Sequence, residues 1–178
     1  SAVSAAWTMS LELTPFNDRG TGYNFFDGNV WDESPYERIE SVRVGWPSIV
    51  HTGNGREVVV SHPGIDTPLH MAWREAGSGA VWTEASIPSD LVVGKLWPRM
   101  AAGGEDGNTL HVICVTTPVA NGGTIHQDQD GALLYYRSQD AGDTWDVTDM
   151  VFADLDSSAF ANFSGDTYAI HARGNTVA

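Results

Sequence analysis

The chain has 178 residues, of which 42% are hydrophobic, and its 23 acidic and 9 basic residues give a formal net charge of −14. This length and composition predict a folded domain and exclude a disordered chain. The acidity excludes a nucleic-acid binder, which needs clustered cations to neutralise phosphates, and attachment to an anionic membrane surface. No apolar run approaches the roughly 20 residues of a membrane-spanning helix, so we expect no membrane insertion.

Short runs of β-branched and aromatic residues, separated by glycine-rich turns, predict strands along the whole chain. A partial first unit covers residues 6–31, and a last unit opens over residues 166–177. Two full units between them are predicted to have four strands each, namely Ser48–Thr52, Glu57–Ser61, Pro68–Arg74 and Val81–Ile87, then Arg99–Ala102, Thr109–Thr116, Ala132–Ser138 and Thr144–Val151. No segment sustains a 3.6-residue periodicity, so we expect very little helix.

Two markers repeat along the chain. Trp31, Trp82 and Trp145 are each preceded by a glycine three residues earlier and lie 51 and 63 residues apart, while Trp46-Pro47 and Trp97-Pro98 also lie 51 residues apart. Repeats of roughly 40 to 50 residues are typical of β-propellers. The sequence therefore predicts an all-β fragment of one β-propeller with about three four-stranded antiparallel blades, divided into a partial blade 1 in about 1–40, blade 2 in about 41–93, blade 3 in about 94–158 and the start of blade 4 in about 159–178.

Residues 138–145 read Ser-Gln-Asp-Ala-Gly-Asp-Thr-Trp, a pattern that suits a tight hairpin. The serine hydroxyl and the aspartate carboxylate can accept hydrogen bonds from backbone N–H groups of the turn. The glycine can adopt a positive φ, and the tryptophan can pack under the turn. We therefore expect a structural hairpin built by Ser138, Asp140, Gly142, Thr144 and Trp145.

This segment matches the Asp-box S-x-D-x-G-x-T-W at every fixed position, and the chain resembles the Asp-box, or BNR-repeat, sialidase-like β-propellers. The copies at the two earlier tryptophans are degenerate, with Phe26 and Gly77 where Asp140 stands. Residues 18–24, 40–48 and 163–168 look most like propeller proteins that Bacteroidetes bacteria export through the type IX secretion system. The resemblance implies an extracellular or cell-surface location and the secretion machinery of the outer membrane as a partner.

The resemblance leaves two functions open, because an Asp-box is not itself an active site. The first is a non-catalytic binding or adhesion module, or a secretion cargo, whose partner is a carbohydrate or another surface protein. The second is a sialidase-type glycoside hydrolase acting on acidic sugars, which needs arginines for the substrate carboxylate, a tyrosine nucleophile paired with a glutamate, and an acidic proton donor. Arg43 and Arg99 flank the Trp-Pro pairs and are the candidates for ligand-facing residues, with structural ion pairs as the competing interpretation.

The acidic loop that begins at His126 superficially resembles the opening of a calcium-binding loop. Its first position is a histidine, and its twelfth is Arg137 where an EF-hand has a bidentate glutamate, so an EF-hand is excluded. A looser oxygen site for calcium, formed by Asp128 and Asp130, stays open beside a simple solvated loop. We expect no other cofactor.

Overall fold

The protein is described by a computed structural model that covers residues 1–64, 67–76, 79, 81–165 and 167–178. These residues form strands and two 3-10 turns, η1 (Val119–Asn121) and η2 (Ala153–Leu155), and they contain no α-helix. The prediction of an all-β chain is therefore confirmed. No helix in these ranges has the length and apolar character needed to cross a membrane.

The strands form four antiparallel sheets in chain order. The N-terminal sheet pairs β1 (Val3–Met9) with β2 (Gly20–Phe26). The middle sheet is ordered β3 (Gly45–His51), β4 (Arg56–His62), β5 (His70–Glu75) and β6 (Thr83–Ser86). The third sheet is ordered β7 (Lys95–Gly103), β8 (Thr109–Thr116), β9 (Leu133–Ser138) and β10 (Val147–Met150), and the C-terminal hairpin pairs β11 (Ala172–Arg173) with β12 (Thr176–Val177).

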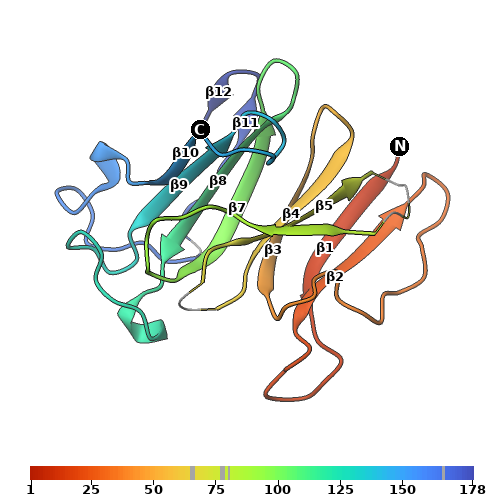
Figure 1. Ribbon diagram of the computed structural model, residues 1–178, viewed down its shortest axis with the longest axis horizontal. Coiled ribbons are helices and arrows are strands. Elements are labelled where there is room, and N and C mark those ends of the chain that lie inside the picture. The colour runs from red at the N-terminus through yellow and green to blue at the C-terminus, as the bar shows by residue number, and fades with distance from the viewer. Residues whose placement is uncertain (65–66, 77–78, 80, 166) are drawn as a thin grey trace.

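The N-terminal, middle and third sheets follow one another across the molecule, and the C-terminal hairpin overlaps the third sheet in this view (Figure 1). The N-terminal sheet and the third sheet lie on opposite sides of the middle sheet, and the two chain ends shown in Figure 1 lie on opposite sides as well. The first strands of neighbouring sheets are in contact, since β3 lies against β7 and β7 lies against β11. We call the face of a sheet that looks toward the preceding sheet its front face and the opposite face its rear face.

The main hydrophobic core lies between the rear face of the middle sheet and the front face of the third sheet. Side chains alternate between the two faces of a strand, so every second residue of β4, β5, β8 and β9 points into this interface. The buried members include Val58, Val60, Met71, Leu110, Val112, Leu134 and Tyr136. Removing this apolar surface from water stabilises the contact between the sheets at about 25 cal/mol per Å².

A backbone hydrogen bond between turns recurs along the row. The N–H of Gly53, in the turn after β3, donates to the carbonyl of Gly107, in the turn after β7, at 3.0 Å. In the same way Gly104 donates to the carbonyl of Gly174, in the turn between β11 and β12, at 2.7 Å. A Cβ on Gly53 would lie 1.7 Å from the carbonyl oxygen of Asp106, so only glycine allows the turns to approach this closely.

Two strands begin earlier than predicted, at Gly45 and Lys95 instead of Ser48 and Arg99. Trp46 and Trp97 have φ values of 51° and 53°, and the strand register shifts beside each of them. The register shift marks a β-bulge, where part of the strand ladder is left unpaired. Proline is tolerated at this place because it has no N–H to donate to the ladder. The Trp-Pro pair therefore bends the strand without ending it.

Asp149 joins the segment after β6 to the third sheet. Its carboxylate accepts hydrogen bonds from the Tyr136 hydroxyl at 2.5 Å, from the Ser89 hydroxyl at 2.7 Å and from the backbone N–H of Asp90 at 2.8 Å. Nearby, the buried Lys95 ammonium donates to the carbonyl of Leu91 at 2.8 Å. These contacts fix the connection between the two four-stranded sheets.

We expect Asp149→Ala to lower the free energy of unfolding by about 2 to 3 kcal/mol, because three donors lose a charged acceptor and Tyr136 is buried. Urea unfolding followed by tryptophan fluorescence measures this loss. Asp154→Ala, at an exposed aspartate of η2, is the matched control and should change stability by less than about 0.5 kcal/mol. Equal effects of the two substitutions would contradict the assigned role of Asp149.

Candidate functional site

The two Trp-Pro bulges meet at one cleft. Trp46 from β3 and Trp97 and Arg99 from β7 line it together with Ser164 and Gly165, and its volume is about 230 Å³. Trp46 is 44% exposed, so part of its indole ring faces the solvent. The cleft thus combines indole rings with a cationic, hydrogen-bonding group.

The preceding sheet holds each bulge in place. The N–H of Trp46 donates to the Thr8 hydroxyl of β1 at 2.8 Å, and the N–H of Trp97 donates to Nδ1 of His62 in β4 at 3.0 Å. The His62 ring also stacks on the indole of Trp46, with centroids 5.0 Å apart and planes 17° apart. Burial, with a smaller contribution from the nearby Arg19, lowers the pKa of His62 to about 4, so this histidine is a neutral acceptor at pH 7.

The structure places the two predicted ligand-facing arginines in different settings. Arg99 lines the cleft and donates to the carbonyl of Gly165 at 3.1 Å. Arg43 donates to the carbonyl of Phe16 at 2.8 Å and so holds the loop between β1 and β2. Among the predicted residues, Arg99 alone contributes to this cleft.

The residues of the predicted hairpin, 138–145, form a set of mutual hydrogen bonds around the turn after β9. The Ser138 hydroxyl accepts from the N–H of Gly142 at 2.8 Å, and the Asp140 carboxylate accepts from the N–H and the hydroxyl of Thr144 at 2.8 and 2.5 Å. Gly142 has a φ of 96°. The Trp145 ring meets Tyr136 edge to face, with centroids 6.5 Å apart, beside the core between the middle and third sheets.

The two degenerate copies differ from this hairpin. In the first copy, Asp27 lies one residue after the expected position and accepts hydrogen bonds from the N–H groups of Asn29 and Val30 at 2.7 and 2.8 Å. The fixed spacing of the motif missed this acceptor, although the pair Asp27-Gly28 is a turn signal. Trp31 packs on Phe26 but is 50% exposed, whereas Trp145 is partly buried against the core. Gly77, at the aspartate position of the second copy, lies outside the described residues.

The calcium candidates lie in a tight turn that closes with hydrogen bonds between the backbones of His126 and Gln129. Asp128 is exposed, while the Asp130 carboxylate accepts from the N–H of Val119 at 2.8 Å. Gln129 is buried and donates to the carbonyls of Leu155 and Phe160, so the turn anchors residues 155–160. Within the described ranges, no group of three or more potential metal ligands comes together, and a calcium site stays a prediction.

A tyrosine and a glutamate of the kind that a sialidase requires do meet, between the N-terminal and middle sheets. The Tyr23 hydroxyl donates to Glu57 at 2.6 Å, and Arg74 donates to the same carboxylate at 3.0 Å. The guanidinium of Arg74 lies 4.4 Å from the Tyr23 ring centroid and 4.5 Å from that of Trp82. Burial and the adjacent Glu57 raise the pKa of Tyr23, which is the opposite of an activated nucleophile, and the Glu57 side chain is fully buried.

The neutral acceptor role of His62 predicts an acid-sensitive contact between the sheets. Because the pKa is depressed in the folded state, the contribution of His62 to stability is present above about pH 6.5 and is lost as the pH falls toward 4. The loss is on the order of 3 kcal/mol.

His62→Asn keeps an acceptor near the Nδ1 position but removes the titrating ring. We expect this variant to be less stable at pH 7, since the stack on Trp46 is lost, and to show a smaller loss of stability between pH 6.5 and 4 than the wild type. Urea midpoints across that range test this, with His171→Asn, at an exposed histidine, as the control. A slope equal to that of the wild type would show that His62 does not titrate as described.

No protein-family model matches this chain, and no curated protein matches it. The Asp-box resemblance therefore rests on residues 138–145 and on the repeats of glycine and tryptophan. The function is inferred from the geometry of the described residues.

Proposed function

We propose that this chain is part of a secreted or cell-surface β-propeller of the Asp-box kind, which binds carbohydrate at the cleft of Trp46, Trp97 and Arg99 and does not cleave it. The observation that carries the proposal is the meeting of both Trp-Pro bulges and one arginine in a single cleft.

The propeller part of the proposal is supported by the way in which the sheets succeed one another. Each new sheet places its first strand against that of the preceding sheet, and the turn-to-turn hydrogen bond recurs with the same polarity. The resemblance implies a ligand near the central channel of a propeller, and the bulges lie on β3 and β7, the first strands of their sheets.

Carbohydrate suits the cleft because a sugar ring presents apolar C–H groups to an indole and hydroxyl groups to a guanidinium. Trp46 and Trp97 are kept at positive φ, a strained state that other contacts must maintain, and such strain concentrates at binding sites. The Tyr23–Glu57 contact argues against hydrolysis, because the Glu57 side chain is fully buried and paired with Arg74.

We expect Trp46→Ala and Arg99→Gln each to weaken binding to a carbohydrate ligand at least about tenfold, with the fold retained. A glycan array containing neutral and acidic sugars identifies the ligand, and titration calorimetry measures its affinity. Arg43→Gln is the matched control, since this arginine binds the loop between β1 and β2, and should leave affinity unchanged.

Two results would count against the proposal. The assignment of the cleft as a carbohydrate-binding site would be contradicted if the array gave no signal. It would also be contradicted if the Arg43 and Arg99 substitutions had equal effects on affinity. Turnover of a fluorogenic sialoside would contradict the non-catalytic role and favour the glycoside hydrolase.

A further inference from the structure

The two indoles of the cleft come from different sheets and are joined through one side chain. His62, the last residue of β4, accepts a hydrogen bond from the N–H of Trp97 at 3.0 Å. Its ring also stacks on Trp46, with centroids 5.0 Å apart. His62 is only 4% exposed. A buried imidazole ring therefore contacts both of the tryptophans that line the cleft.

The hydrogen bond from Trp97 fixes the tautomer of the His62 ring. Nδ1 is the acceptor, so the hydrogen of the neutral ring lies on Nε2. A protonated ring carries hydrogen on both nitrogens and cannot accept. Protonation would therefore set Nδ1–H against the N–H of Trp97 and break this contact between the sheets.

The other contacts of Trp97 come from residues that follow the third sheet. Its carbonyl accepts from the Tyr168 hydroxyl at 2.6 Å, and a Cβ added to Gly165 would lie 2.7 Å from its indole ring. These contacts do not require a particular protonation state of His62. The hydrogen bond from Trp97 to the middle sheet does require one.

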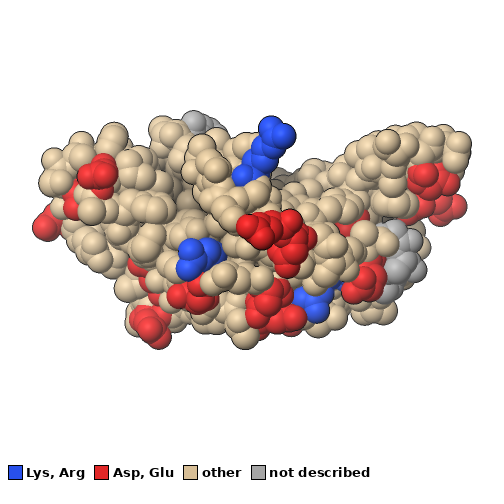
Figure 2. All heavy atoms as spheres, turned by 90° about the horizontal axis from the view of Figure 1, so that it is seen from above, with Lys and Arg blue, Asp and Glu red and all other residues tan. Residues whose placement is uncertain are grey.

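Two electrostatic effects act on His62 in opposite directions. The net charge of −14 favours protonation, and Figure 2 shows acidic side chains spread over the visible face with few basic ones. Burial favours the neutral ring, and so does the guanidinium of Arg19, which lies 5.1 Å from the Trp46 ring centroid. Of the described residues that line the cleft, Arg99 is charged and none is a carboxylate. The local effects are the larger, since the pKa of His62 is lowered to about 4.

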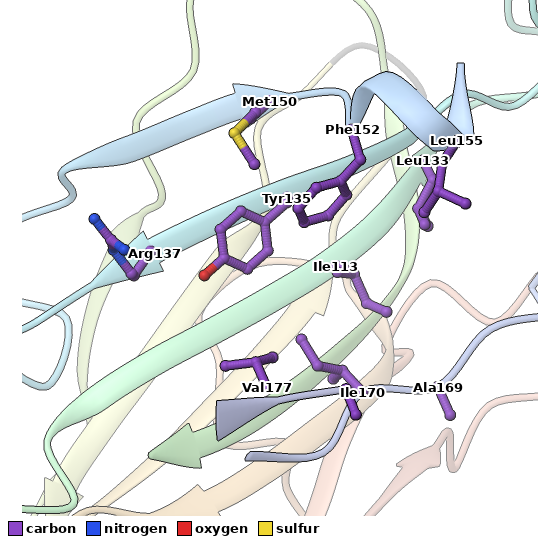
Figure 3. A pocket seen from close by; sticks show the side chains of 11 residues that line it. Ile113, Leu133, Tyr135, Arg137, Met150, Phe152, Leu155, Ala169, Ile170 and Val177 are labelled. Carbon is purple, nitrogen blue, oxygen red and sulfur yellow. The ribbon is translucent and has the colours of Figure 1, made fainter. Parts of the chain in front are cut away.

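A larger hollow on the third sheet is separate from this cleft. It is a groove of about 440 Å³, and no described residue lines both hollows. Figure 3 shows its mainly apolar lining, which includes Ile113, Leu133, Phe152 and Ile170. The groove lies on the rear face of the third sheet, which a further sheet covers in the proposed propeller. A ligand is therefore expected at the cleft and not in the groove.

We propose that His62 is a positioning residue of the cleft, which holds Trp46 and Trp97 at the spacing that a carbohydrate needs, and that the carbohydrate binds only while the His62 ring is neutral. This inference rests on the proposed function, because it concerns the same cleft. Protonation removes the hydrogen bond of Trp97 and adds a cation beside Arg19. By linkage, a bound carbohydrate makes protonation of His62 harder by the same factor by which protonation weakens binding.

The first test is the pH dependence of affinity, measured by titration calorimetry with the glycan that gives the strongest array signal. The apparent affinity follows the fraction of protein in the binding-competent state. With a pKa of about 4, we expect an affinity that is constant from pH 8 to 5.5 and then falls about twofold by pH 4 and about fourfold by pH 3.5. Circular dichroism at each pH establishes that the protein is folded.

Two substitutions separate the stack from the hydrogen bond. His62→Phe keeps a ring over Trp46 but cannot accept from Trp97, and we expect it to weaken affinity at pH 7 at least fivefold and to abolish the fall below pH 5. His62→Asn keeps an acceptor without the titrating ring, so its affinity should lie between those of the other two proteins and should not fall in acid. His171→Phe, the same change at an exposed histidine, is the matched control and should bind like the wild type at every pH.

The second test needs no carbohydrate. The nitrogen NMR shifts of the His62 ring report which nitrogen carries hydrogen, and the backbone amide shift of Trp97 reports its hydrogen bond. We expect the Nε2–H tautomer at pH 7 and a joint change of both signals near pH 4.

The results distinguish a failure of this inference from a failure of the proposed function. An Nδ1–H tautomer, or a Trp97 amide that does not respond to protonation of His62, overturns the positioning role even if the protein binds carbohydrate. An affinity that does not fall below pH 5, or a His62→Phe variant that binds like the wild type, overturns it as well. If no glycan binds, the proposed function and the coupling to a carbohydrate fail together, while the NMR signals still decide whether His62 links the two indoles.

Discussion

The architecture depends on one constraint, which is that the apolar faces of neighbouring sheets must cover one another. Alternation along β4 and β5 sends Val58, Val60 and Met71 to the rear, where the third sheet buries them. The glycine turns make this stacking regular, because the bond from Gly53 to the next turn forms only where no side chain intervenes. Burial supplies the stabilisation, and the turn contact sets how the sheets align.

The two interfaces of the middle sheet are built from different chemistry. Its rear face is apolar, whereas on its front face Glu57 gathers hydrogen bonds from Ser4, Tyr23 and Arg74. Burial alone would raise the pKa of Glu57, but these donors lower it below its ordinary value, so the carboxylate is charged inside the interface. A buried carboxylate is stabilised only while each of its donors is in place, so the front interface fixes how the N-terminal and middle sheets align. The rear interface is stabilised instead by the apolar area that it buries.

Much of the fold could be predicted from the sequence, because strands with strong alternation and glycine turns leave a clear pattern. Thr109–Thr116 is a strand with the predicted bounds. The bulges could not be predicted, since a tryptophan at positive φ is rare and proline usually marks the end of a strand. The repeat placed Trp46 and Trp97 in equivalent positions, and their equivalence was the available signal for the cleft.

The candidate site was harder to predict, because its partners come from segments that do not repeat. Arg43 and Arg99 lie next to equivalent Trp-Pro pairs, but the first meets the loop between β1 and β2 and the second meets Gly165. His62 gave no signal in the sequence, because its role comes from a strand of the preceding sheet. The propeller and its carbohydrate remain proposals that rest on these contacts.

The burial of Lys95 has a practical consequence for work on this protein. It is the only lysine in the sequence, and its ammonium lies beneath the segment that joins the two four-stranded sheets. Reagents that acylate side-chain amines therefore find no exposed target on the folded chain and react at this position only when the third sheet opens. Acylation of the Lys95 side chain, detected by mass spectrometry, would report opening of the core at this one position without any engineered label.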